Sequence, residues 1–231
     1  MLVLNNASTD DLSDIAQRYA GRVEFCESDV NRGFGTGHNL LATKANSTFL
    51  CCVNPDVEIT HADAFERLLE NFDDHSVAVA GPMLCTESAR PQLWDHGELT
   101  GIRARIANGA GHAHWRPRDE RIEAAWVSGA FLLARRSAFD AIGGFDERYF
   151  LYKEEEDLCL QMRRNNYKVI YDPTVKVIHT GGVVAKRSTQ HHTASLQYYM
   201  NKNFPRRWLR KSLEVIYLRV SRRIGIRPRG G

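Results

Sequence analysis

Short apolar runs along the chain alternate with segments whose apolar residues repeat at helical spacing. The runs end in turn-forming or polar residues, as strands of a sheet do. This alternation predicts an α/β fold built on a mostly parallel sheet. Strands are expected at Leu2–Leu4, Val23–Cys26, Thr48–Val53, Val77–Gly81, Trp126–Ala134 and Val175–Ile178. Helices are expected at 9–20, 37–46, 61–72, 137–141, 153–165 and in the C-terminal tail.

Residues 86–123 break this alternation. The segment is polar and has little periodicity, although it contains two tryptophans and three histidines. A long irregular insert in a compact domain is usually either functional or disordered, and the sequence leaves both possibilities open.

A run of four acidic residues lies in "YFLYKEEEDLCLQM", residues 149–162. At about 100° per residue, a helix over 153–165 places Glu155 in the middle of an apolar face. That face consists of Leu151, Leu158, Cys159 and Met162. Glu154 and Glu156 flank it and Asp157 points nearly the opposite way, so these three are expected on the surface. A carboxylate on an inward face is costly unless it is paired, binds a metal or acts as an acid or base. Glu155 is therefore either functional or part of a structural salt bridge.

Composition and charge indicate one domain with an appendage. The chain has 231 residues, of which 43% are hydrophobic, and no apolar run approaches the ~20 residues that span a bilayer. The five cysteines form no CxxC motif, which favours reduced thiols in a cytoplasmic protein over disulfides or a zinc site. The net charge of +3 divides unevenly, because ten of the 31 Lys and Arg residues lie from Lys202 onward. The expected division is a body over 1–200 and a tail over 201–231.

The tail is predicted to be a basic amphipathic helix. Its apolar residues at helical spacing are Leu209, Leu213, Ile216, Tyr217, Val220 and Ile224. Such a helix either lies in an anionic membrane surface or packs on the domain with its basic face solvated. Nucleic acid is a weaker alternative, because stacking aromatics do not interleave with the basic residues. We expect no nucleic-acid partner and a peripheral position on the inner face of the plasma membrane.

Polar residues follow three of the predicted strands. Asn5-Asn6, Asn54-Pro55-Asp56 and His179 each come directly after a strand, at the edge where sheets of this kind bind ligands. With Glu155 they predict one site, in which a carboxylate and an imidazole bind a divalent metal and a second carboxylate acts as base. Each residue alone is also common in a plain turn.

The segment "NRGFGTGHN", residues 31–39, is a glycine-rich turn that leads into a helix. It either approaches a ligand closely, such as a phosphate at the helix N-terminus, or is an ordinary flexible turn.

Taken in order, these segments resemble the family 2 glycosyltransferases of GT-A fold, especially the rhamnosyltransferase-like branch of bacterial cell-surface polysaccharide synthesis. The resemblance covers about 180 residues, and its most specific part is residues 128–164. The matching stretches are "NNASTD" (5–10), "NRGFGTGHN" (31–39), "VNPDVEI" (53–59), "GPML" (81–84), "SGAFLLARRSAFDAIGGFDERYFLYKEEEDLCLQMRR" (128–164) and "VIHTGG" (177–182).

The resemblance implies roles for particular residues. Asp56 stands in the family's D-x-D-type motif and would bind Mg²⁺ or Mn²⁺, with His179 completing the metal site. Glu154-Glu155 stands where the family has Glu-Asp, whose second acid is the catalytic base. The residues implied to bind the donor are Asn5, Asn6, Gly33, Gly35, Asn54 and Asp56, and those implied to bind the acceptor are Trp126 and Gly129.

The implied reaction is an inverting sugar transfer from a nucleotide-diphosphate sugar, such as dTDP-rhamnose or a UDP-sugar, to a lipid-linked or polysaccharide acceptor. Three features depart from the family. Glu155 replaces its usual Asp, Asn5 replaces a nucleotide-facing Asp, and the chain begins at the family's second strand. We therefore expect an N-terminally truncated domain with an exposed sheet edge.

Two other functions compete with this one. A non-catalytic remnant would bind a membrane or a partner through its tail, although Asp56, Glu155 and His179 persist together. A sugar-nucleotide nucleotidyltransferase would need a basic glycine-rich pyrophosphate loop near the N-terminus, and the sequence has none.

Overall fold

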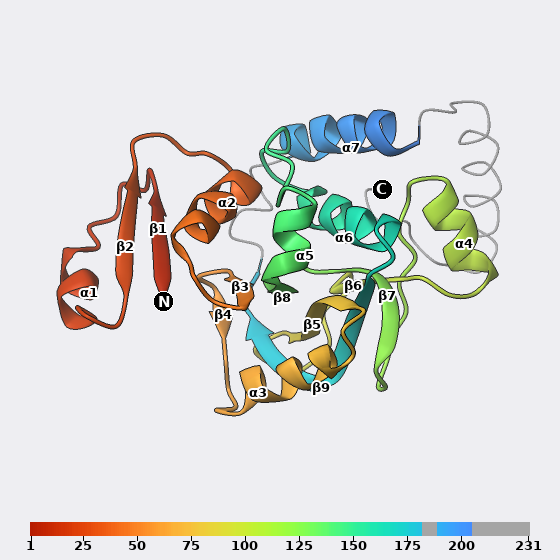
Figure 1. Cartoon of the computed structure of the whole chain (residues 1–231), viewed down its shortest axis with the longest axis horizontal. Helices are drawn as coiled ribbons and strands as arrows, with labels where there is room; N and C mark the ends of the chain where they lie inside the picture. Colours follow the sequence, from red (N-terminus) through yellow and green to blue (C-terminus); the bar gives the residue numbers. More distant parts are fainter. Residues whose placement is uncertain (182–188, 205–231) are drawn as a thin grey trace.

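A seven-stranded sheet forms the centre of the molecule in the computed structural model, which describes residues 1–181 and 189–204 (Figure 1). Its strands pair in the order β3-β8-β5-β9-β7-β6, and β4 pairs with β9. Their bounds are β3 Phe49–Val53, β4 Val57–Glu58, β5 Val77–Cys85, β6 His96–Glu98, β7 Ile122–Val127, β8 Phe131–Arg135 and β9 Lys168–His179.

The sheet is mixed. Both β3 and β5 pair antiparallel with β8, while β5 and β9 pair parallel. Therefore β3, β5 and β9 run in the same direction, and their carboxyl ends lie at one edge of the sheet. This is the edge at which the polar residues after β3 and β9 are expected to meet.

A second, two-stranded parallel sheet consists of β1 (Leu2–Asn6) and β2 (Glu24–Ser28), joined through the short helix α1 (Ser13–Arg18). Figure 1 shows α2 (Phe34–Lys44) between this small sheet and the main one. The helix packs closely on β1 at Gly37, where an added Cβ would lie 3.1 Å from Leu4 Cδ2.

The core lies on both faces of β5, whose nine residues are all buried. One face packs against α6 (Glu154–Arg164) through Leu158, Cys159 and Met162. The other packs against α3 (Ala64–Leu69) and the adjoining 3-10 helix η1 (Glu70–Asp73). Burial on two faces explains why "VAVAGPMLC" is a continuous apolar run instead of an alternating one.

The fold class and most predicted elements are confirmed, with three corrections. The single strand expected at Trp126–Ala134 is wrong, because a turn at 128–130 separates β7 from β8. The insert 86–123 contains β6 and a helix, α4 (Ile102–Gly109). A further helix that the pattern did not predict, α7 (Thr189–Asn203), follows β9. The predicted helix of the tail falls on residues 205–231, which lie outside the described part of the chain.

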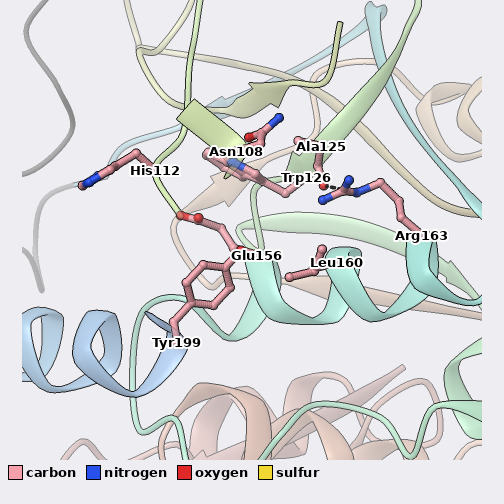
Figure 2. Close-up of a pocket in the computed structure, with 8 residues that line it drawn as sticks. All are labelled: Asn108, His112, Ala125, Trp126, Glu156, Leu160, Arg163 and Tyr199. Atoms are coloured by element: carbon pink, nitrogen blue, oxygen red, sulfur yellow. Dashed lines mark hydrogen bonds between the residues drawn. The ribbon is translucent and has the colours of Figure 1, made fainter. Parts of the chain in front are cut away.

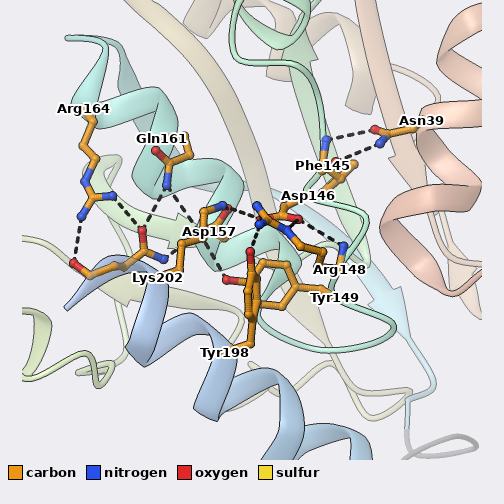
Figure 3. Close-up of polar contacts among 11 residues, drawn as sticks. Asn39, Phe145, Asp146, Arg148, Tyr149, Asp157, Gln161, Arg164, Tyr198 and Lys202 are labelled. Carbon is orange, nitrogen blue, oxygen red and sulfur yellow. Dashed lines mark hydrogen bonds and ion pairs between the residues drawn. The ribbon is translucent and has the colours of Figure 1, made fainter. Parts of the chain in front are cut away.

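The surface position expected for Glu154, Glu156 and Asp157 is also wrong. All four acids of the first turn of α6 are buried, and Asp157 is only 1% exposed. For Asp157 the reason is α7, which lies across α6 (Figure 1). Lys202 of α7 places its Nζ 2.6 Å from Asp157 Oδ2 and 2.7 Å from Asp146 Oδ2, and Asn203 donates to Asp157 Oδ1 at 2.7 Å (Figure 3).

No helix in the described ranges, 1–181 and 189–204, is long and apolar enough to cross a membrane.

The remaining described helix, α5 (Arg136–Ala141), follows β8 directly.

Replacing Lys202 by Ala is expected to lower the free energy of unfolding by about 2–3 kcal/mol, because the buried Asp157 and the partly buried Asp146 lose a partner that is itself 24% exposed. Burial alone would raise the pKa of Asp146, but Arg148 and Lys202 outweigh it and hold that pKa below its usual value. The loss should therefore be largest above about pH 4 and shrink as the pH falls. Urea denaturation of the parent and the variant across this range measures it.

Lys44→Ala is the matched control, since its ion pair with Glu24 is exposed on both sides and should contribute less than about 1 kcal/mol. Equal effects of the two substitutions would contradict the assigned role of Lys202.

Candidate active site

The structure brings Asp56 and His179 together at the edge where β3 and β9 end. His179 Nε2 lies 3.4 Å from Asp56 Oδ1, and both side chains remain partly accessible. The contact is supported by the backbone, because Val57 of β4 pairs with His179 of β9 and the Thr180 amide donates to the Asp56 carbonyl at 3.0 Å. The expectation that these two residues meet is therefore fulfilled in geometry.

The turn at 128–130 touches both halves of the predicted site. On one side, the amide of Asn54 donates to the carbonyl of Ala130 at 2.9 Å, which holds the segment leading to Asp56. On the other side, a Cβ added to Gly129 would lie 3.5 Å from Glu155 Cβ and 3.0 Å from the Phe34 ring. The 128–130 turn therefore contacts both the segment that leads to Asp56 and Glu155 of the acidic turn.

A strained backbone leads into the acidic helix. Tyr152 and Lys153 have φ values of 70° and 72°, in the left-handed region that non-glycine residues rarely adopt. Lys153 then turns inward, and its Nζ lies 2.8 Å from Glu156 Oε2. Consecutive strained residues persist where the surrounding structure fixes them, commonly at functional sites.

Glu154 and Glu155 occupy the first turn as a pair of buried carboxyl groups, 3% and 9% exposed. Glu154 Oε2 has no hydrogen-bond partner among the described residues. Burial, followed by the charge of Glu155, raises the pKa of Glu154 to about 8. A buried carboxyl whose pKa is raised by burial and by a neighbouring carboxylate is typical of sites that use an acid and a base.

The glycine-rich turn packs against the loop that precedes α6. Gly33 has φ 79°, and a Cβ there would lie 2.2 Å from the Phe150 carbonyl oxygen, which accepts from the Phe34 amide at 3.0 Å. A Cβ at Gly35 would lie 2.9 Å from Phe145 Cβ. Both glycines are buried, so their small size serves this close approach of protein to protein.

Asn5 and Asn6 end β1 beside that turn. Asn6 accepts from the Arg32 amide at 2.8 Å and donates to the Gly33 carbonyl at 3.2 Å, so it holds the turn in place. Asn5 accepts from the Ser8 amide at 2.9 Å, which ties the end of β1 to the loop that follows it.

Trp126 lines a cavity of about 130 Å³ between α4, β7, α6 and α7 (Figure 2). Tyr199 and Leu160 contribute apolar surface, while Glu156 and Arg163 contribute charge. The remaining lining residues are Asn108, His112 and Ala125. Gly129 is not part of this lining and lies instead against Glu155.

The insert 86–123 carries a buried ionic cluster that sequence patterns did not identify. His96 stacks on Tyr171 at 3.9 Å and its Nδ1 lies 2.7 Å from Asp95 Oδ1, while Nε2 lies 3.7 Å from Glu98. Arg118 binds Glu98 through two hydrogen bonds of 2.6 and 2.7 Å. In the sequence, only the two acids that flank a histidine in "WDHGEL", residues 94–99, indicate this cluster. This cluster anchors the insert to the sheet.

Sequence comparison places this chain in a known family. The model of glycosyl transferase family 2 matches residues 1–143, which is more than half of the chain. The chain belongs to this family. Similar proteins include N-acetylglucosaminyl-diphospho-decaprenol L-rhamnosyltransferase of Mycobacterium tuberculosis (strain CDC 1551 / Oshkosh), 28% identical over 93% of this chain and 81% of that protein. O-antigen chain rhamnosyltransferase WbaN of Salmonella anatum is 27% identical over 83% of this chain and 60% of its own.

Solved structures show that this glycosyltransferase has the GT-A fold. GalNAc-T7 with UDP, GalNAc and Mn²⁺ superposes with a TM-score of 0.64 at 12% identity, over 87% of this chain and 41% of that one. Mannosyltransferase PcManGT from Pyrobaculum calidifontis, with GDP-Man and Mn²⁺, gives 0.57 at 13% identity, over 95% and 65%. The expected fold and the rhamnosyltransferase-like resemblance are confirmed. The family model ends before Glu154, Glu155 and His179. The roles of these three residues are therefore argued from their positions in the structure.

Glu154→Gln is expected to stabilise the glycosyltransferase increasingly as the pH rises from 5 to 9. A folded-state pKa raised above the ordinary value means that the parent loses stability as Glu154 is forced to ionise, at about 1.4 kcal/mol per pKa unit. The amide mimics the protonated group and removes this loss. Urea denaturation at pH 5.5 and pH 9 measures the difference.

Glu66→Gln, on the exposed side of α3, is the control and should leave the pH dependence of the parent unchanged. Parallel pH profiles for the parent and Glu154→Gln would show that Glu154 is already ionised at neutral pH.

Proposed function

We propose that this glycosyltransferase transfers a sugar, with L-rhamnose the first candidate, from a nucleoside-diphosphate donor to a hydroxyl group of a lipid-linked or polysaccharide acceptor, with inversion at the anomeric carbon. The proposal rests on one observation: the 128–130 turn touches both the Asp56 segment and Glu155. The names of the rhamnosyltransferase relatives support the choice of sugar, and the decaprenol-linked acceptor named for one of them supports the choice of acceptor.

In this proposal Glu155 is the general base. As the acceptor oxygen attacks the anomeric carbon, its proton passes to the Glu155 carboxylate, and the bond between that carbon and the diphosphate breaks with its electrons leaving on the diphosphate. Burial and the charge of Glu155 raise the pKa of Glu154 to about 8, which favours the protonated form of Glu154 at neutral pH beside the Glu155 carboxylate. Lys153 donates to both carboxylate oxygens of Glu156.

Asp56 and His179 would hold a divalent cation, Mg²⁺ or Mn²⁺. Their donor atoms are 3.4 Å apart, close to the ~3 Å edge of an octahedron with metal–ligand distances of 2.0–2.1 Å. In the described residues no group of three or more His, Cys, Asp or Glu side chains forms a complete site. Two protein ligands suit a cation that also binds substrate phosphates. When bound, the cation would supply charge stabilisation for the departing diphosphate.

Donor and acceptor would reach this pair from different sides. Asn5, Asn6 and Asn54 end β1 and β3, where amide groups suit the nucleotide and diphosphate. The Trp126 cavity, with aromatic, amide and charged groups, suits part of a saccharide or lipid-diphosphate acceptor. The basic tail over 205–231, outside the described residues, remains our proposal for contact with an anionic membrane surface, on its sequence alone.

Asp56→Ala is expected to abolish Mn²⁺-dependent binding of a nucleotide sugar, because it removes the anionic metal ligand. His179→Ala is expected to weaken this binding, because it removes the neutral metal ligand. Calorimetric titration with dTDP-rhamnose and UDP-sugars, with and without Mn²⁺, measures this. Asp63→Ala, at an exposed position before α3, serves as the control. Unchanged binding in both site variants would sink the metal assignment.

Glu155→Gln is expected to leave donor binding near that of the parent and to lower turnover ~10²-fold or more, because the amide keeps the shape but accepts no proton. Glu155→Asp should retain activity, since the carboxylate remains. Single-turnover transfer assays with matched donor occupancy separate the two steps. Normal turnover in Glu155→Gln would show that Glu155 is not the general base.

A further inference from the structure

Gln92 is bound to His179 at two points, although the two residues are 87 positions apart in sequence. Gln92 Oε1 lies 2.9 Å from the ring nitrogen Nδ1 of His179, and Gln92 Nε2 donates to the backbone carbonyl of the same residue. The side-chain amide of Gln92 therefore contacts both the ring and the backbone of His179, the histidine that faces Asp56.

This double contact determines where the ring proton lies. A backbone carbonyl only accepts hydrogen bonds, so the NH₂ end of the Gln92 amide must face it. The oxygen end then faces His179 Nδ1 and can only accept, so Nδ1 must carry the proton. In the neutral ring, Nε2 is left with its lone pair, and this is the atom 3.4 Å from Asp56 Oδ1.

The position of Gln92 is itself fixed. The chain after β5 turns back on itself. Cys85 and Pro91 form an isolated antiparallel β-bridge, and the backbone N–H of Gln92 donates to the Leu84 carbonyl at 2.8 Å. Gly181, at φ 59°, folds over the pair, and a Cβ there would lie 3.5 Å from His179 Cε1 and 3.6 Å from Gln92 Nε2. The ring is held between the hairpin and the backbone that follows β9.

We infer that Gln92 is a positioning residue, which sets His179 in the Nδ1-protonated tautomer and turns the Nε2 lone pair toward Asp56 for a divalent cation. In the neutral ring, the Nε2 lone pair and the carboxylate oxygen that face each other repel unless a cation lies between them. Partners that donate to or accept from the second ring nitrogen of a ligating histidine fix its tautomer in this way. The part of the inference that concerns the cation rests on the proposed function, whereas the tautomer does not.

The test combines a spectroscopic and a binding measurement on the full chain. In ¹⁵N-histidine-labelled, metal-free protein at pH 8, long-range ¹H–¹⁵N NMR should show His179 protonated at Nδ1, with the signal assigned by its loss in His179→Gln. Gln92→Leu, which keeps bulk but removes both hydrogen bonds, should shift the ring toward the Nε2-protonated form. It should also weaken binding of Mn²⁺ alone, followed by electron paramagnetic resonance, by ~10-fold or more.

Ser88→Ala is the matched control on the same hairpin, because its hydroxyl contacts only Thr86 among the contacts described for it. It should change neither measurement. An Nε2-protonated His179 in the parent, which needs no variant to fold, would overturn the inference, as would an unchanged tautomer in Gln92→Leu. If the tautomer shifts as expected but the parent binds no Mn²⁺, then Gln92 positions the ring and the metal role in the proposed function is wrong.

Discussion

Burial of four carboxyl groups in one helical turn is the constraint on which the site depends. Removing a carboxylate from water costs several kcal/mol unless it is paired, hydrogen-bonded or protonated. The first turn of α6 uses a different solution at each position. Glu156 is paired with Lys153 and Asp157 with Lys202, while burial and the charge of Glu155 raise the pKa of Glu154. Glu155 lies against the 128–130 turn, with Gly129 and Phe34 beside it.

The pairing of Asp157 also fixes how α6 is rotated. Tyr149, Lys202 and Asn203 all donate to its carboxylate, and the last two come from α7. Figure 3 shows Lys202 and Tyr149 directed at Asp157. With Asp157 held in this way and Leu158 and Met162 packed on the sheet, the helix has one orientation. The small size of Gly35 and Gly129 then allows the turn of carboxyl groups to lie directly against α2 and the end of β7. Polar anchoring on one side and close packing on the other determine where the proposed base points.

The sequence predicted what depends on local pattern and missed what depends on distant partners. The strand at Phe49–Val53 and the helix at Glu154–Arg164 follow from apolar runs and helical spacing, and both were found within a residue. The break between β7 and β8 was missed, because Ser128 and Gly129 lie within an otherwise apolar stretch. Asp157 was placed outside, since its partner Lys202 is 45 positions away on a helix that showed no strong pattern. Gln92 was missed for the same reason, because a polar hairpin has no periodicity that reveals which residue it faces.

The dependence of α6 on α7 has a consequence for biosynthesis. Asp157 leaves the ribosome 45 residues before Lys202, the residue that neutralises it. At translation rates of about 5–20 residues per second, the acidic turn waits roughly 2–9 s without its partner. During that interval, burial of Asp157 against Tyr149 is unfavourable. We therefore expect α6 to remain undocked from the sheet while the earlier strands assemble. We therefore expect docking of α6 on the sheet to be a late event, set by the order of synthesis, so that a nascent chain stalled between these two positions would present the acidic turn to solvent.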